Sequence, residues 1–147
     1  AYFPRLKALL GAAPGRIDVA MFFVSLTGPT HPSGELLALL ADAHDAGRAV
    51  RVLVDRDGDD DPYGSRIINA AAIEFLAERG VPVRTDSAEN LLHSKFVVID
   101  ERLAVLGSHN WTAGSYFRYH DTSVAIDSAE FAATLGERFQ TLWDNGV

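Results

Sequence analysis

The sequence contains no cysteine and only two lysines, Lys7 and Lys95, among its 147 residues. Without cysteine there is no disulfide framework and no thiolate to act as nucleophile or metal ligand. Any catalytic nucleophile must therefore be Ser, Thr, His, Lys or a carboxylate. The absence of cysteine also leaves the redox compartment undetermined.

The sequence also lacks a long hydrophobic run. Apolar stretches such as Val19–Val24 are far shorter than the about 18 residues of a transmembrane helix, so we expect a soluble protein without a membrane span. No basic and apolar leader opens the chain, and Ala1 is compatible with the removal of a leader or tag. Both a cytoplasmic location and export after leader removal are consistent with this. The length predicts a single domain, residues 1–147, with one core.

Positive charge is scarce, because 13 Lys and Arg residues face 20 Asp and Glu residues and the net charge is -7. Nucleic-acid binding normally rests on a basic surface, so this balance argues against a polyanionic substrate. A few arginines in one cleft can nevertheless focus a positive field that the net charge hides.

Strand and helix patterns alternate along the first part of the chain. Ser33 is the predicted N-cap of the first of these helices, and Gly47 and Gly80 follow the predicted helix ends. A strand, a helix and a second strand predict a right-handed βαβ unit with parallel strands. The predicted strands are Ile17–Phe23, Ala49–Asp55 and Val81–Arg84, and the predicted helices are Glu35–Ala46 and Ser65–Arg79.

From Leu91 onwards the pattern changes to antiparallel strands. Two apolar runs joined by a short polar turn, Ser94–Ile99 and Leu103–Leu106, predict a hairpin. A last strand, Thr122–Ile126, precedes an amphipathic helix, Ser128–Trp143, with Ser128 as its N-cap. The predicted fold class is therefore α/β, with a mixed β-sheet flanked by helices on both faces.

Four polar side chains stand where the two hairpin strands meet the following loops: His93, Lys95, Ser108 and Asn110. With Asp100-Glu101 as a two-residue turn, His93 lies opposite Ser108, and alternation puts the four groups together. Lysine, serine and asparagine all donate hydrogen bonds, so the cluster suits the oxygens of a phosphoryl group. Gly107 would let a phosphate approach the backbone.

The spacing His93-Ser94-Lys95-(x)4-Asp100-(x)6-Gly107-Ser108-His109-Asn110 resembles the phospholipase D superfamily at each of its fixed positions. Similarity extends to Arg48–Asp55 (RAVRVLVD) and Phe139–Trp143 (FQTLW). The resemblance implies a phospholipase D-like α/β/α sandwich, as in small single-motif bacterial endonucleases of that family. The superfamily also contains phospholipases, phosphatidyltransferases and piRNA-pathway proteins, so the motif leaves the substrate open.

The resemblance further implies a role for each motif residue. His93 would be the nucleophile that forms a phosphohistidine, while Lys95 and Asn110 hold the non-bridging oxygens, with Ser108 beside them. Asp121 resembles the acidic residue that hydrogen-bonds the catalytic histidine, and Asp100 would be structural. No metal or other cofactor is implied. Because the motif occurs once, the acid that protonates the leaving group is expected from the His93 of a second copy in a homodimer. His120 is the first alternative within the chain.

Several residues around the motif admit two interpretations. Trp111, Tyr116, Phe117 and Tyr119 follow the motif and are candidates for contact with bases or a lipid interface, but Trp111 and Phe117 are equally well explained as core residues. Trp111, Gly107 and His120 are the substrate-binding candidates. His109 is predicted to be structural. The acidic run Asp55–Asp61 is predicted to be a solvated loop rather than a calcium site.

These observations support three functional hypotheses. The first is a metal-independent phosphodiesterase acting on nucleic acid, which the resemblance favours because compact single-motif members of the family often act so. The second is a phospholipase D or phosphatidyltransferase, which would need an apolar channel beside His93. The third is a non-catalytic nucleic-acid-binding domain that retains the motif.

Overall fold

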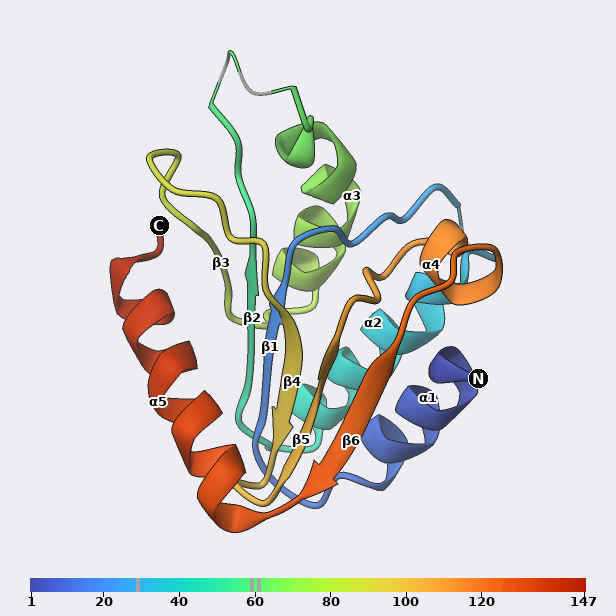
Figure 1. Cartoon of the computed structure of the whole chain (residues 1–147), viewed down its shortest axis with the longest axis vertical. Coiled ribbons are helices and arrows are strands. Elements are labelled where there is room, and N and C mark those ends of the chain that lie inside the picture. Colours follow the sequence, from blue (N-terminus) through green and yellow to red (C-terminus); the bar gives the residue numbers. More distant parts are fainter. Residues whose placement is uncertain (29, 59, 61) are drawn as a thin grey trace.

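The computed structural model describes residues 1–28, 30–58, 60 and 62–147. A sheet of six strands, in the order β3-β2-β1-β4-β5-β6, crosses the whole molecule (Figure 1). Strands β1, β2 and β3 are parallel to one another, whereas β4, β5 and β6 join the sheet through antiparallel pairings. The predicted mixed sheet is thus confirmed. The strands are β1 Ile17–Met21, β2 Val50–Val54, β3 Val83–Thr85, β4 Lys95–Ile99, β5 Leu103–Gly107 and β6 Ser123–Asp127.

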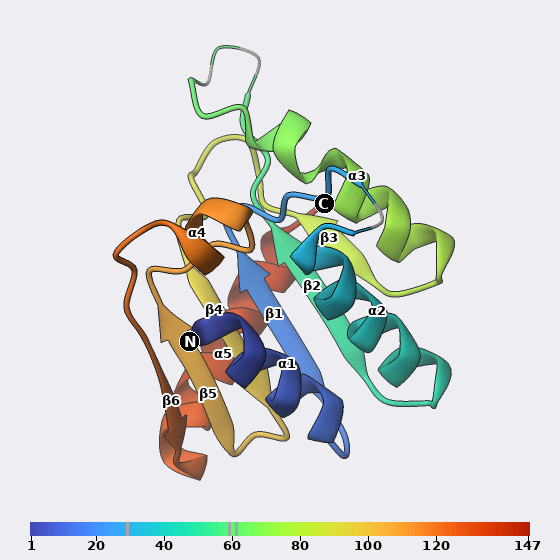
Figure 2. The same ribbon diagram turned by 90° about the vertical axis from the view of Figure 1, so that its right-hand side faces the viewer.

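Helices cover both faces of this sheet (Figures 1 and 2). Side chains of β4 alternate between them: Val97 and Ile99 join the core under α1, α2 and α3, whereas Phe96 and Val98 pack with α5. This is the predicted layered α/β arrangement. No helix in the described part of the chain is long and apolar enough to cross a membrane. The helices are α1 Tyr2–Ala12, α2 Pro32–Asp45, α3 Ser65–Glu78, α4 Ala113–Phe117 and α5 Ala129–Asn145.

Local sequence signals explain most of the helix ends. Gly47 and Gly80 follow α2 and α3 with φ angles of 85° and 71°, a conformation that glycine adopts without steric cost. Ser128 caps α5 as predicted, since its side chain accepts a hydrogen bond from the amide of Phe131. The prediction for α2 was wrong: His31 is its N-cap, and Ser33 lies inside the first turn. Helices α1 and α4 were not predicted.

The turn between β4 and β5 differs from the predicted one. Asp100 and Glu101 both adopt positive φ angles, and the amide of Arg102 donates to the carbonyl of Ile99, as a two-residue turn requires. The strands nevertheless pair Ile99 with Leu103, so Arg102 is an extra residue. The predicted register, with His93 opposite Ser108, was therefore off by one residue.

Trp111 belongs to the core and does not contact the solvent. Its side chain is fully buried and its indole N–H donates to the hydroxyl of Tyr2 over 3.2 Å. Its backbone carbonyl accepts from the hydroxyl of Ser33, and Trp111 pairs with Val24 in a short parallel bridge. The expectation of Trp111 as a substrate-binding residue was wrong, because a ring that is enclosed on all sides cannot stack on a substrate.

Replacing Trp111 tests this assignment. Trp111→Ala should lower the free energy of unfolding by about 3–5 kcal/mol, because it leaves a large cavity between α1 and the sheet. Urea denaturation followed by circular dichroism measures this loss. Ile67→Ala, at a residue 79% exposed on α3, is the control and should change stability by less than about 0.5 kcal/mol. A similarly small effect of Trp111→Ala would contradict a core role.

Candidate active site

The predicted motif residues converge on one cleft at the end of the sheet where β4 begins and β5 ends. The cleft has a volume of about 660 Å³. Polar groups of the motif share it with apolar side chains of the sheet and of α5. The sequence-based prediction that the motif residues meet is thus matched by their placement. The lining residues are His93, Ser94, Lys95, Phe96, Leu106, Gly107, Ser108, Asn110, Asp121, Leu135 and Arg138.

His93 lies just before β4, where its ring is exposed to the cleft. The ring packs against Phe22, with 4.9 Å between the two centroids. The preceding residue, Leu92, is held by its amide, which donates to the carboxylate of Asp55 over 2.7 Å. Asp55 is completely buried at the end of β2. This hydrogen bond fixes the direction from which the chain enters β4 and thereby positions the imidazole.

Asp55 is itself held by the buried side chain of Asn69 on α3. The Asn69 amide group donates to the backbone carbonyls of Asp55 and Phe22, both over 2.9 Å, and its oxygen accepts from the amide of Val24 over 2.7 Å. One side chain thus ties together the ends of β1 and β2. Asp55 and Asn69 were not among the predicted site residues; a carboxylate directly after a buried strand was the available signal.

Lys95 is the cation of the motif, and its side chain is only 9% exposed. Its ammonium group donates to the carbonyl of His93 over 2.5 Å and lies 5.1 Å from the centroid of the Phe22 ring. Burial lowers the pKa of Lys95, while the nearby Asp121 carboxylate opposes this shift. The ammonium is therefore held in place beside His93 by a backbone carbonyl and an aromatic face.

The surroundings of His93 favour its neutral form. Burial lowers the pKa of His93 below its ordinary 6.5, and repulsion from Lys95 lowers it further, whereas attraction to Asp55 raises it. A neutral imidazole has a free lone pair and can act as a nucleophile near neutral pH.

Ser108 and Asp121 connect the ends of β5 and β6. The hydroxyl of Ser108 donates to the carboxylate of Asp121 over 2.9 Å and accepts from the amide of Thr122 over 2.9 Å. Asp121 was expected to hydrogen-bond the catalytic histidine, but within the described chain its partner is Ser108. The carboxylate still acts on the site through its charge, because it stabilises the ammonium of Lys95.

Asn110 points its amide group into the same cleft. The side-chain oxygen accepts from the amide of Phe23 over 3.3 Å. The amide nitrogen has no hydrogen-bond partner within the part of the chain that the structure describes. This arrangement leaves an N–H donor for a substrate oxygen in the cleft that Lys95 also lines.

The remaining predicted residues lie outside the cleft. Asp100 stands in the turn at the opposite end of the sheet, where its amide donates to the carbonyl of Arg16, which suits a structural role. His120 is exposed and does not line the cleft.

The acidic run Asp55–Asp61 is not wholly solvated as predicted, since Asp55 and Asp57 are buried. Asp57 accepts from the amide of Arg66 and thereby caps α3. Asp59 and Asp61 lie outside the described residues.

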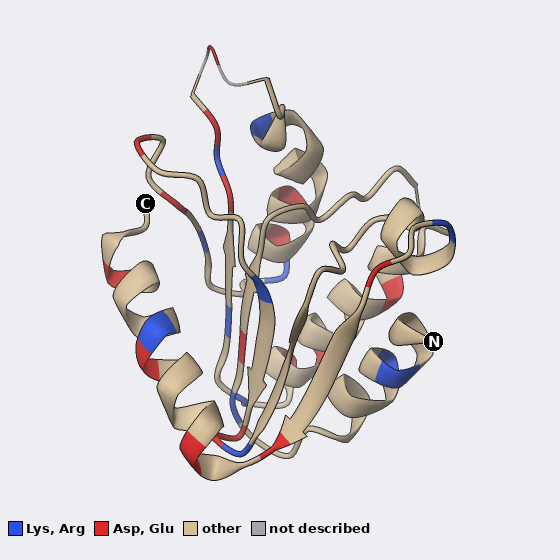
Figure 3. Ribbon diagram, in the orientation of Figure 1, with Lys and Arg blue, Asp and Glu red and all other residues tan. Residues whose placement is uncertain are grey.

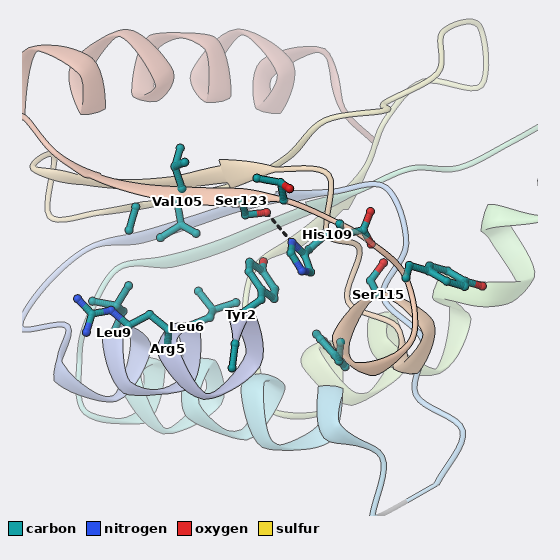
Figure 4. Close-up of a pocket in the computed structure, with 15 residues that line it drawn as sticks. Tyr2, Arg5, Leu6, Leu9, Val105, His109, Ser115 and Ser123 are labelled. Atoms are coloured by element: carbon teal, nitrogen blue, oxygen red, sulfur yellow. Dashed lines mark hydrogen bonds between the residues drawn. The ribbon is translucent and has the colours of Figure 1, made fainter.

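His109 faces a second cavity, of about 620 Å³, between α1 and β6 (Figure 4). Its ring stacks on Tyr2 with 4.1 Å between centroids, and its Nδ1 is hydrogen-bonded to the hydroxyl of Ser123 over 2.8 Å. Figure 4 shows Tyr2, His109 and Ser123 adjacent in this cavity. His109 is therefore structural, as predicted. Asp121 is the residue that lines both cavities.

Comparison with known proteins identifies the family. The sequence profile of the family described as "Cardiolipin synthase, PLD-like domain" matches residues 6–143. The chain belongs to the phospholipase D superfamily. Mitochondrial cardiolipin hydrolases of this superfamily are similar in sequence: the human protein is 29% identical over 139 residues, and that of Chlamydomonas reinhardtii is 24% identical over 140 residues. Each match covers 95% of this chain, but only 49% and 56% of the respective relative. The chain thus spans about half the length of these relatives.

Solved structures of the phospholipase D superfamily share the fold. The phospholipase D family member Nuc from Salmonella typhimurium superposes with a TM-score of 0.78 at 24% identity. NucT from Helicobacter pylori superposes with a TM-score of 0.75 at 14% identity. Both matches cover 98% of this chain and 88% of the other chain, so the predicted phospholipase D-like fold is confirmed.

The charges around His93 predict opposite effects of two substitutions on its pKa. Asp55→Asn should lower the pKa of His93, because a neutral amide no longer attracts the imidazolium; Lys95→Gln should raise it, because the repulsion is lost. Titration of the histidine C2 protons by NMR measures both shifts, with His93→Asn identifying the resonance. Shifts in the same direction would show that these charges do not control the imidazole.

The packing of β5 against β6 at the cleft leaves no room for a side chain at Gly107. A Cβ atom at this position would collide with the Ser123 hydroxyl and the Thr122 carbonyl. Gly107→Ala should therefore push β6 away from β5, lower stability by on the order of 1–3 kcal/mol and disturb the Ser108–Asp121 pair. Gly136→Ala is the matched control, because its Cβ meets open space on α5. Thermal unfolding of both variants decides the matter; equal melting temperatures would refute the close packing.

Proposed function

We propose that the chain hydrolyses phosphodiester bonds without a metal ion, through a covalent intermediate on His93. The observation that carries this proposal is the convergence of His93, Lys95 and Asn110 on one cleft within a phospholipase D superfamily domain. A nucleophile, a cation and an amide donor are the groups that phosphoryl transfer needs. Lys95 and Asn110 supply the positive field that metal ions supply in many other phosphodiesterases.

The reaction proceeds in two displacements. The neutral imidazole of His93 attacks phosphorus, and the bond from phosphorus to the leaving oxygen breaks. The ammonium of Lys95 and the amide of Asn110 donate hydrogen bonds to the non-bridging oxygens, where negative charge accumulates. The leaving oxygen takes a proton from an acid. Water then attacks the phosphorus of the phosphohistidine and gives a proton to the group that acted as the acid, which is now a base. The bond between phosphorus and His93 breaks, and His93 is released.

The acid in this scheme is the His93 of a second copy of the chain. His93 is the only imidazole among the described residues that line the cleft, because His109 faces the second cavity and His120 lies outside. A two-fold dimer that brings two such clefts together would supply one neutral and one protonated imidazole at one phosphate.

Nucleic acid is the substrate that we favour. The cleft is open, and two cations, Lys95 and Arg138, line it beside the polar motif residues and a few apolar side chains. A lipid phosphodiester is the second candidate, since relatives of the chain are named cardiolipin hydrolases. Phe117 and Tyr119, which are 63% and 66% exposed, would then meet the lipid interface.

Activity should survive chelation. Incubation in EDTA with labelled single-stranded DNA, single-stranded RNA and phosphatidylcholine or cardiolipin vesicles should give cleavage of a nucleic acid at the rate seen without EDTA. Lys95→Ala should lower that rate on the order of a hundredfold or more, because the phosphate loses its cation. Loss of turnover in EDTA that a divalent ion restores would refute metal independence. Turnover of the vesicles alone would favour the second candidate.

Mixing subunits tests whether two copies share one site. His93→Asn chains are mixed with an equal amount of wild-type chains under conditions that allow exchange. Random pairing leaves about one quarter of the dimers with two wild-type chains, so total activity should fall to roughly one quarter of an all-wild-type sample at the same total concentration. A fall to only one half would mean that each chain acts alone and that the acid lies within it.

A further inference from the structure

A second cleft adjoins the active site along α5. Its volume is about 650 Å³, and it shares Ser94 and Arg138 with the cleft that holds His93. One face of α5 forms a wall of both clefts. Its residues that line them are three or four positions apart, as on one side of a helix: Leu135, Arg138, Thr141, Leu142 and Asn145. The residues that line the second cleft are Asp86, Ser87, Glu89, Asn90, Leu91, Leu92, Ser94, Arg138, Thr141, Leu142 and Asn145.

Arg138 stands at the junction of the two clefts. It is the single basic residue of α5, which also carries Glu130, Glu137 and Asp144, and the blue segment of this helix in Figure 3 is bordered by red ones. Besides Lys95 it is the only cation among the described residues that line the catalytic cleft. Its guanidinium forms no hydrogen bond or ion pair within the described chain.

Several other arginines are engaged in contacts within the fold. Arg51 is paired with Asp18, Arg79 with Asp42 and Asp45, and Arg84 donates to the carbonyl of Trp143. Arg138 differs from these residues because the N–H donors of its guanidinium have no partner among the described residues. It also adjoins the site that would hold the reacting phosphate. A guanidinium in this state is suited to a second phosphate.

We propose that the second cleft is a subsite for the nucleotide next to the scissile bond, and that Arg138 binds the phosphate group adjacent to the scissile phosphate. This inference rests on the proposed phosphodiesterase function. The carboxylates of Asp86 and Glu89 would repel a phosphate deeper in the cleft, so the flanking phosphate lies at Arg138 and the nucleoside lies beyond it.

The lining of the second cleft favours a nucleoside over an acyl chain. Asp86, Glu89 and Asn90 can accept hydrogen bonds from sugar hydroxyls and base amino groups, and the amide group of Asn90 can donate them. An acyl chain would have to displace water from these carboxylates without replacing their hydrogen bonds, which is unfavourable. The occupant that fits is therefore a single-stranded nucleic acid.

The test compares Arg138→Gln with Arg48→Gln. Arg48 lies between α2 and β2, at the other end of the sheet, so the control removes the same charge away from the clefts. Two substrates are used: a labelled oligothymidylate, which has flanking phosphates, and bis(p-nitrophenyl) phosphate, which has none. Arg138→Gln should lower kcat/KM for the oligonucleotide by about ten- to hundredfold and leave that for bis(p-nitrophenyl) phosphate within about twofold. Arg48→Gln should leave both unchanged.

Binding gives a readout that is independent of turnover. In a His93→Asn background, fluorescence anisotropy measures the Kd of labelled oligothymidylate across a series of salt concentrations. Removing one phosphate contact should weaken binding and reduce the slope of log K against log salt by about 0.7. If wild-type protein fails to hydrolyse bis(p-nitrophenyl) phosphate, the proposed function falls, yet this measurement still decides the subsite.

Three results would overturn the subsite. Equal losses on both substrates would place Arg138 at the scissile phosphate itself. An unchanged oligonucleotide Kd and salt slope would show that the second cleft is not occupied by nucleic acid. A selective loss on cardiolipin vesicles relative to phosphatidylcholine vesicles, with oligonucleotide cleavage intact, would assign Arg138 to the second phosphate of a lipid.

Discussion

The hydrogen bond from the amide of Leu92 to the buried carboxylate of Asp55 is the contact on which the site depends. A buried carboxylate is costly unless it is hydrogen-bonded, so Asp55 at the end of β2 needs a donor such as the amide of Leu92. Asn69 holds the backbone of Asp55 in position and ties it to the end of β1. The same carboxylate fixes the entry into β4 and moderates the pKa of His93. One residue thus positions His93 and counteracts the lowering of the His93 pKa by burial and by Lys95.

The charge distribution explains how an acidic chain can keep a cation in the cleft that holds His93. Several of its basic residues are neutralised elsewhere on the fold by ion pairs, such as Arg51 with Asp18 and Arg102 with Asp127. Figure 3 shows blue and red segments interspersed over helices and strands alike. In the cleft that holds His93, by contrast, the ammonium of Lys95 is held by a backbone carbonyl and an aromatic ring, and it forms no salt bridge with any of the described residues. The net charge of -7 therefore says little about this site.

The sequence predicted the sheet type and the convergence of the motif residues well, because both rest on short-range patterns. Apolar runs bounded by glycines predicted β1, β2 and their parallel pairing, and the motif spacing predicted that His93, Lys95, Ser108 and Asn110 meet. Register could not be predicted in the same way. It depends on whether Arg102 pairs or bulges, and the backbone of Asp100 and Glu101 alone does not decide that.

The roles of Trp111 and Asp55 depended on long-range packing. An indole after a motif looks the same in sequence whether it contacts substrate or, as here, fills the space beside Tyr2. Asp55 looked like the first residue of a solvated acidic loop, and only its partner at Leu92, 37 residues along the chain, reveals its function. Such residues are recognised by their partners in space and not by their neighbours in sequence.

The covalent role of His93 is the central claim, and trapping the intermediate tests it most directly. A reaction quenched in alkali within the first turnover, with substrate in excess, should carry a phosphoryl adduct on the peptide that contains His93, and mass spectrometry can place it. The adduct should be stable to base, labile to acid and absent from His93→Asn. An adduct on another residue, or active turnover with no adduct at any time point, would contradict the account.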